Sequence, residues 1–308
     1  MFLEHFGLRG NPFGVTADAR FLYFGPEHRE ALSALYLSIL EGRGLSALIA
    51  QAGMGKTTLL RYLAARLKDR AAVALLSHPY RSRTDLMGDL AKRLRLPSEQ
   101  SEFQQVAHLQ LCLKKLAQQR RKLVLLFDEA QAMSDEALEQ VRLLSNLRST
   151  NMNLLEIVIA GQPELDDLFR RPELESFRQR VSVVARIPRF TPEHVQAYVN
   201  RRLEVAGRTE PVFDEAAVAA IAKVSGGVPR TINQLCYKAL ALAWADGETT
   251  VGAELIEEAS RDMDWTLTAP VPTAAETEEA RGTAAARPPE RALERPQPIA
   301  LQRGLRVV

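Results

Sequence analysis

Near its beginning, the chain runs from a short apolar segment through a glycine-rich loop directly into a helix. The apolar run is "LSALIA" at 45–50, the loop is "QAGMG" at 51–55, and "KTTLLRYLAARLKD" at 56–69 repeats leucine and alanine at helical spacing. Strand, loop and helix in this order are the start of a layered α/β arrangement, in which helices connect parallel strands.

Further apolar runs of strand length continue the pattern, and helical segments separate them. These runs are "AAVALLSH" at 71–78, "KLVLLFDEA" at 122–130, "LLEIVIAG" at 154–161 and "VSVVARI" at 181–187. Buried runs alternating with helices predict a parallel sheet that is covered on both faces.

The pattern changes after Phe190, where only helical segments follow. We therefore expect an α/β domain over 1–190 and a small all-helical lid domain over 191–265. The last segment, 266–308, is rich in Pro, Ala, Arg and Glu and shows no periodicity, so it is predicted to be a disordered tail.

Composition excludes several classes of protein. A 46% share of hydrophobic residues supplies a sizeable core, and a net charge of +2 does not by itself call for nucleic acid. The two cysteines form no metal-binding pattern. No signal peptide is visible, and no uncharged apolar run approaches the ~18 residues of a membrane span, so we expect a soluble cytoplasmic protein.

The loop nearly matches the phosphate-binding pattern G-x-x-x-x-G-K-[ST], with Ala50 in place of the first glycine. An alanine there costs little if its φ is negative, and about 1–2 kcal/mol if its φ is positive. Backbone N–H groups and the helix N-terminus would surround the phosphates, while lysine adds charge and the next hydroxyl binds magnesium. We expect ATP and Mg²⁺ here rather than a chance surface loop. The residues predicted to bind the nucleotide are Gln51, Ala52, Gly53, Met54, Gly55, Lys56, Thr57 and Thr58.

Two adjacent acids end the third apolar run, in "LVLLFDEAQ". Asp128 can complete the magnesium shell together with Thr57, and Glu129 can orient and polarise the attacking water. Phosphoryl transfer depends mainly on positioning and charge stabilisation, so carboxylates at a strand tip fit it. The alternative is that both acids only cap the next helix. The second acid favours hydrolysis over binding alone.

Polar residues after the later runs are further candidates. Gln162, in "IVIAGQPEL", is placed to reach the γ-phosphate or the water, or is an ordinary turn residue before Pro163. Arg178 and Arg180 precede the fifth run; Arg180 is our choice for an arginine that reaches a neighbouring subunit's nucleotide, against a solvated surface arginine. Arg230, in "GGVPRTIN", is placed to touch the phosphates, or is simply exposed.

With these motifs, the chain resembles an AAA+ ATPase of the ExeA, or general secretion pathway protein A, type, and also the exosortase-associated and the TniB and MuB transposition ATPases. The resemblance covers roughly residues 2–263 and rests on "FGLRGNPFG", "FDEAQ", "GQPEL", "LESFRQRV" and "GGVPRTINQLC". The chain resembles the ATPase module of this family alone. The resemblance implies Walker roles for Lys56, Thr57, Asp128 and Glu129, sensor roles for Gln162 and Arg230, the finger role for Arg180, and an adenine flanked by the segment near Phe13 and Tyr23.

Three hypotheses follow for the activity. The first is an ATP-hydrolysing switch that forms a homo-oligomer, a ring or a filament, and regulates or assembles an unidentified protein partner in a secretion or polysaccharide-export system. The second is an ATP-dependent DNA-binding protein of the transposition type, with the basic runs at 81–83, 114–115 and 120–122 lining a DNA path. Solvated helix faces explain these runs equally well. The third is a nucleotide-binding scaffold without turnover, against which Glu129 argues.

Overall fold

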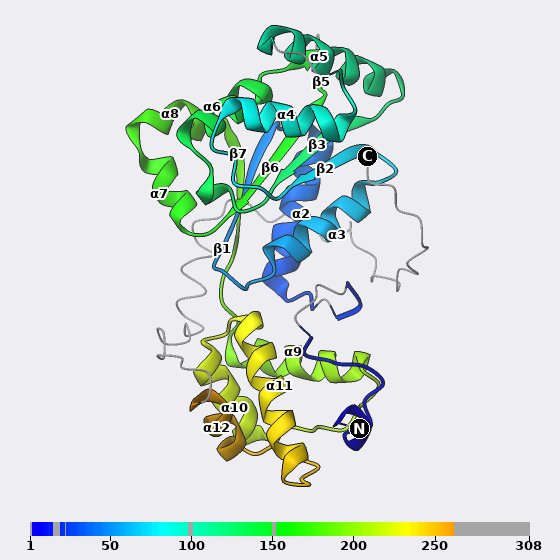
Figure 1. Ribbon diagram of the computed structural model, residues 1–308, viewed down its shortest axis with the longest axis vertical. Coiled ribbons are helices and arrows are strands. Elements are labelled where there is room, and N and C mark those ends of the chain that lie inside the picture. Colours follow the sequence, from blue (N-terminus) through cyan, green and yellow to red (C-terminus); the bar gives the residue numbers. More distant parts are fainter. Residues whose placement is uncertain (1, 15–18, 22, 98–100, 150–151, 262–308) are drawn as a thin grey trace. The chain divides into compact units, whose positions relative to one another are not determined.

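The computed structural model describes residues 2–14, 19–21, 23–97, 101–149 and 152–261 (Figure 1). Its internal contacts divide the chain into two units. Among the described residues, Pro26–Ala52 and Lys56–Ile187 form the α/β unit, whereas those before residue 26, Gly53–Gly55 and 188–261 form the helical unit. The predicted tail at 266–308 lies outside the described residues.

The α/β unit is built on a five-stranded sheet in the order β2-β3-β6-β1-β7, and every neighbouring pair is parallel. This confirms the fold class predicted from the sequence. β1 and β6 lie in the interior of the sheet and are buried throughout, which explains their uninterrupted apolar runs. The strands are β1 (Leu45–Ala50), β2 (Ala71–Leu76), β3 (Lys122–Phe127), β6 (Leu155–Gly161) and β7 (Val181–Ile187), with a separate two-residue ladder of β4 (Arg148–Ser149) and β5 (Met152–Asn153).

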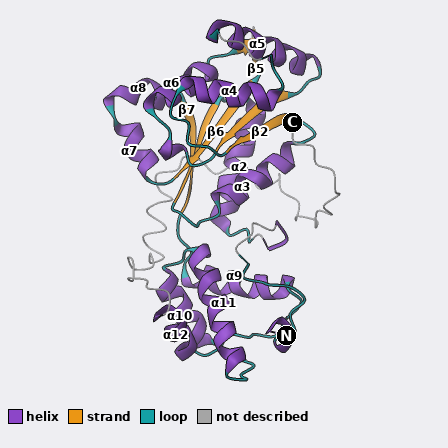
Figure 2. Cartoon of the chain, in the orientation of Figure 1, coloured by secondary structure: helices purple, strands orange, loops and turns teal. Residues whose placement is uncertain are grey.

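Helices cover both faces of this sheet (Figure 2). Alternate residues of β1, such as Ala47 and Ile49, share a core cluster with α4 to α8, because side chains along a strand alternate between the faces. Ser46 lies between these alternate residues and points to the opposite face of the sheet. Its hydroxyl forms a 2.7 Å hydrogen bond with the hydroxyl of Ser38 in α2. The helices are α2 (Pro26–Glu41), α3 (Lys56–Leu67), α4 (Arg83–Leu94), α5 (Glu102–Gln118), α6 (Asp135–Ser145), α7 (Glu164–Arg170) and α8 (Glu175–Arg178).

The helical unit has a core of its own, built from four longer helices and the beginning of the chain. Thr191 accepts a hydrogen bond from the backbone N–H of His194 and so caps α9, as its place before Pro192 predicts. No helix among the described residues is long and apolar enough to cross a membrane. The helices are α1 (Phe2–His5), α9 (Pro192–Val205), α10 (Glu215–Ser225), α11 (Pro229–Ala245) and α12 (Ala253–Arg261).

The beginning of the chain packs into the helical unit, whereas the sequence-based division groups it with the α/β domain up to residue 190. Phe13 is 2% exposed and meets Phe213 edge to face, with ring centroids 5.9 Å apart. The buried guanidinium of Arg202 donates to the backbone carbonyl of Pro12. Aromatic rings and a buried charge thus join segments that are far apart in sequence, and no periodic pattern announces such contacts. Phe13 thus belongs to this core, and the place of its segment beside adenine stays a prediction.

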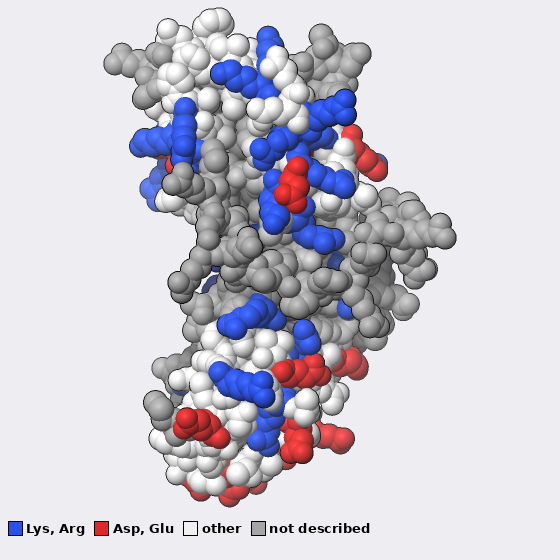
Figure 3. All heavy atoms as spheres, turned by 90° about the vertical axis from the view of Figure 1, so that its right-hand side faces the viewer, with Lys and Arg blue, Asp and Glu red and all other residues white. Residues whose placement is uncertain are grey.

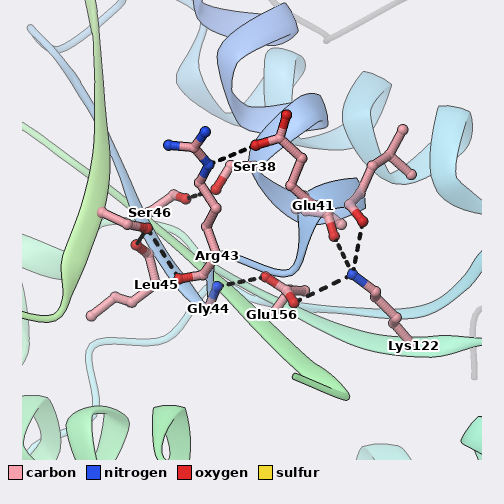
Figure 4. A network of polar contacts seen from close by, with 11 residues as sticks. Ser38, Glu41, Arg43, Gly44, Leu45, Ser46, Lys122 and Glu156 are labelled. Carbon is pink, nitrogen blue, oxygen red and sulfur yellow. Dashed lines mark hydrogen bonds and ion pairs between the residues drawn. The ribbon is translucent and has the colours of Figure 1, made fainter. Parts of the chain in front are cut away.

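A buried carboxylate lies near the amino end of β6, where the α/β unit brings three elements together (Figure 4). Glu156 is 1% exposed and accepts a 2.8 Å hydrogen bond from the N–H of Gly44, just before β1. The ammonium of Lys122 stands 3.6 Å from its other oxygen and donates to the carbonyls of Ile39 and Leu40 at the end of α2. Burial raises the pKa of Glu156 to about 7, although the N–H of Gly44 and the charge of Lys122 act in the opposite direction.

This raised pKa makes the stability of the protein depend on pH. Glu156 holds a proton more tightly in the folded chain than in the unfolded one, where its pKa is 4.5. Folding therefore takes up a proton between these values, and the free energy of unfolding falls as the pH rises from about 4.5 to 7. Glu156→Gln keeps an oxygen acceptor for Gly44 but cannot ionise. We expect urea unfolding to show that the free energy of unfolding of the variant, relative to that of wild type, increases by roughly 1–3 kcal/mol from pH 5 to pH 8.

Glu173→Gln is the matched control, because Glu173 is exposed. It should follow the wild-type profile at every pH. An identical pH dependence in the wild type and Glu156→Gln would show that the pKa of Glu156 does not differ between the folded and the unfolded chain.

Candidate functional site

The loop between β1 and α3 has the backbone shape that its glycines allow. Gly53 and Gly55 have φ angles of 81° and 87°, a region that favours glycine strongly. Ala50, in contrast, is a regular residue of β1 that pairs with Ile187, and it is not among the described residues with positive φ. Alanine at the first position of the motif is therefore free of backbone strain, and the departure from the pattern leaves the loop intact.

Lys56 is the first residue of α3, and its side chain turns back over the loop. Its ammonium donates to the backbone carbonyls of Ala50, at 2.9 Å, and Gln51, at 3.2 Å, and the residue is 4% exposed. A positive charge therefore stands inside the turn, beside the N-terminus of a helix whose first N–H groups have no partner within the helix. This combination attracts anions, and phosphate above all.

The next side chain links the loop to β3. The hydroxyl of Thr57 donates to Asp128 at 2.5 Å, and Asp128, the residue after β3, is 3% exposed. The sequence places these residues 71 positions apart, and the parallel sheet brings them together because both follow the carboxyl end of a strand. A hydroxyl beside a carboxylate is a ligand pair that suits Mg²⁺, which takes few protein ligands and otherwise keeps waters and phosphate oxygens.

Glu129 takes part in a second cluster, with two glutamines. Its Oε2 accepts a 2.7 Å bond from the side-chain amide of Gln131 and a 3.3 Å bond from that of Gln162. The backbone N–H of Gln162 donates to Oε1 of Gln131 at 3.0 Å. The structure thus places two predicted residues, Glu129 and Gln162, in direct contact. Gln131 is an addition that the sequence analysis missed, although it follows Glu129 by two positions in "FDEAQ".

Of the predicted arginines, Arg178 and Arg180 lie away from this cluster, whereas the backbone N–H of Arg230 donates to the carbonyl of the loop residue Gly53 at 3.3 Å. Arg178 ends α8 and Arg180 directly precedes β7, and both are exposed. They therefore stand at the amino end of a parallel strand, whereas the loop and the acids follow carboxyl ends. Arg230 is the second residue of α11 in the helical unit and is also exposed. Their roles stay predictions.

Comparison with known proteins agrees with this geometry. A parallel sheet with a glycine loop after β1 and acids after β3 defines a P-loop nucleoside triphosphatase, and residues 39–169 match the AAA domain family. Over this segment the chain is similar to AAA+ proteins. The chain is 35% identical over 253 residues to general secretion pathway protein A of Aeromonas hydrophila. The aligned region covers 80% of this chain and 46% of that relative. The resemblance to ATPases of this type is confirmed, and the chain spans about half the length of the relative.

Solved structures support the fold independently. Cdc6p from Pyrobaculum aerophilum matches with a TM-score of 0.65 at 19% identity, covering 83% of this chain and 72% of its own. The Aeropyrum pernix ORC2 protein matches with a TM-score of 0.60 at 16% identity, covering 82% and 71%. At these identities the likeness concerns the fold alone.

Replacing Lys56 tests the phosphate site. Lys56→Ala removes the charge inside the turn, and we expect the affinity for ATP with Mg²⁺ to fall by roughly ten- to a hundredfold, the value of one or two charge-assisted hydrogen bonds. Titration calorimetry would measure it. Lys68→Ala removes an exposed lysine just beyond α3 and serves as the control. Wild-type affinity in Lys56→Ala would show that the loop does not hold the phosphates.

Proposed function

We propose that this protein is an Mg²⁺-dependent ATPase that works as a switch, and that ATP-driven assembly of its own subunits regulates or assembles a partner complex. The observation that carries the proposal is the convergence at one sheet edge of a phosphate-type loop, the Thr57–Asp128 pair and a carboxylate, Glu129, held by amides. A site that only bound nucleotide would have no use for the last of these groups.

Each residue has a separate task in this proposal. Residues 51–58 surround the phosphates with backbone N–H groups, and the ammonium of Lys56 moves from the carbonyls it now binds to phosphate oxygens. Thr57 and Asp128 would hold Mg²⁺, and the ion would supply positive charge beside the phosphates when it is bound. Glu129 orients the attacking water and accepts its proton, while Gln162 contacts the γ-phosphate or that water.

The exposed arginines support assembly in trans. Arg180 lies at the edge of the sheet opposite the acids of its own subunit, so a nucleotide it serves would belong to a neighbour. Head-to-tail contacts of this kind generate rings when they close and filaments when they do not. Arg230, at the start of α11, would make the helical unit sense the nucleotide. The similarity to general secretion pathway protein A favours a partner in a secretion or polysaccharide-export system, and a cytoplasmic location.

Replacing Glu129 with its amide tests hydrolysis and switching together. Glu129→Gln removes the proton acceptor but keeps the size of the side chain, so phosphate release should fall roughly a hundredfold or more while ATP affinity stays within about twofold. Size-exclusion chromatography with ATP and Mg²⁺ should show the variant retaining an oligomer that wild type loses as it hydrolyses. Equal phosphate release by both proteins would refute the role of Glu129, and no release by wild type would favour a scaffold without turnover.

A basic surface favours a second candidate, ATP-dependent DNA binding. Arg121 donates to the carbonyls of Lys68 and Ala71, and Lys122 N–H bonds the carbonyl of Arg70, so basic residues preceding β2 and β3 lie together. We call this surface the basic edge and define it as Lys68, Arg70, Arg120 and Arg121. Figure 3 shows Lys and Arg gathered on that side of the α/β unit.

The structure does not join all three predicted basic runs into one path. The run at 81–83 follows the carboxyl end of β2, whereas the run at 120–122 leads into the amino end of β3. A DNA path along the basic edge would include the lysines at 114–115, in the last part of α5, but not the run at 81–83.

Salt dependence separates this candidate from the first. If the basic edge binds DNA when ATP is present, replacing Lys68, Arg70 and Arg120 with alanine should lower the slope of log affinity against log salt by roughly one per removed cation. Fluorescence anisotropy with labelled duplex DNA would measure the slope. Arg81→Ala, at the opposite end of β2, should leave it unchanged. An unaltered slope in the triple variant, or affinity that ignores ATP, would refute DNA binding at this surface.

A further inference from the structure

The side-chain amide of Gln131 forms hydrogen bonds through both its nitrogen and its oxygen, to two different segments of the chain. Its nitrogen donates to the carboxylate of Glu129 at 2.7 Å, and its oxygen accepts the backbone N–H of Gln162 at 3.0 Å. The first partner follows β3 and the second follows β6, its neighbour in the sheet. Gln131 itself lies in the single turn η2 (Ala130–Ala132). One side chain therefore connects the tips of two strands at the candidate site.

The chain leaves little room for Gln131 to move. A Cβ atom on Gly161 would lie 3.0 Å from Oε1 of Gln131 and 2.9 Å from a methyl carbon of Leu165, so glycine at the end of β6 allows the close approach. Ala130 is fully buried and Met133 is 5% exposed, which anchors the turn on either side. The position of the amide is thus set by packing as well as by its two hydrogen bonds.

Glu129 needs such support, because its backbone is in a costly conformation. Its φ of 54° and ψ of 40° are left-handed, a region that non-glycine residues enter at a cost of roughly 1 kcal/mol or more. Among the described residues, both amide donors to its carboxylate go to the same oxygen, Oε2. This arrangement fixes the plane of the carboxylate and leaves Oε1 to accept a proton from water.

We propose that Gln131 is the positioning residue for Glu129: it orients the carboxylate for the attacking water and ties that orientation to the backbone after β6. The inference rests on the proposed ATPase function. Because Gln162 belongs to the same three-residue cluster, a shift of Gln162 on nucleotide binding is passed to Glu129 through Gln131. The water-orienting group and the γ-phosphate contact then move as one unit.

A purely structural role makes a different prediction. If Gln131 only secured the turn after β6, its bond to the N–H of Gln162 would suffice, and the donor to Glu129 would be dispensable. Gln131→Glu separates the two roles, because the variant has the same size and keeps an acceptor for that N–H. It removes the donor and places a second negative charge beside the carboxylate of Glu129.

The experiment measures phosphate release and ATP affinity for wild type, Gln131→Glu, Glu129→Gln and the double variant. We expect Gln131→Glu to lower kcat roughly tenfold or more, since small misplacements of a catalytic group have large effects, while ATP affinity stays within about twofold. In the Glu129→Gln background, adding Gln131→Glu should change kcat by less than twofold, because residues that act through one group are not additive. Gln104→Glu makes the same chemical change at an exposed position of α5 and should match wild type.

The outcomes distinguish this inference from the function on which it rests. Wild-type kcat in Gln131→Glu would overturn the positioning role while leaving the ATPase in place. An equal fold-loss in both backgrounds would overturn it too, since the effect would then not pass through Glu129. If wild type releases no more phosphate than Lys56→Ala, the proposed function itself is wrong and the inference falls with it.

Discussion

The tight turn from β1 into α3 determines where a phosphate-binding charge can stand, and the α/β unit is arranged around that point. Two glycines with positive φ bring the chain back so that Lys56 begins the helix and its ammonium meets the carbonyl of Ala50. Because the strands are parallel, every segment that leaves a carboxyl end emerges at the same edge. Asp128 therefore meets Thr57, the residue after Lys56, and Gln162 meets Glu129, although these residues are far apart in the sequence.

The amino ends of the strands have a different task. There the buried carboxylate of Glu156 and the ammonium of Lys122 tie the start of β1 and the end of α2 to the sheet. The cations of the basic edge, and Arg180 before β7, stand at this same edge. Contacts with partners or with another subunit can form there without obstructing the nucleotide loop of the same subunit.

Periodicity predicted the strands, the fold class and several helix starts, because these depend on local patterns. Ser134, for example, caps α6 through the N–H of Ala137, as its place before two acids indicates. Strand order and the packing of residues 2–14 depend on contacts between distant segments, which leave no periodic signal. In the sequence, Glu156 is a single polar residue within an apolar run. Only the structure shows that its carboxyl group is buried and that its pKa is raised.

The sequence predicted Glu129 and Gln162 of the candidate cluster, but neither Gln131 nor the geometry that joins the three. Ala50 replaces the first glycine of the motif, yet it has the backbone conformation of a regular strand residue. The replacement therefore causes no backbone strain. Glu129 matches the motif, yet its φ is in the left-handed region, as are those of Arg95 and Arg120 elsewhere in the chain. A glycine or asparagine would adopt that conformation more easily but would supply no carboxylate. Strain of this kind persists only where surrounding contacts hold it, and Gln131 and Gln162 provide them. Under the proposed function, the local rule is broken at the residue whose side chain the chemistry would require, which is the pattern expected of a functional site.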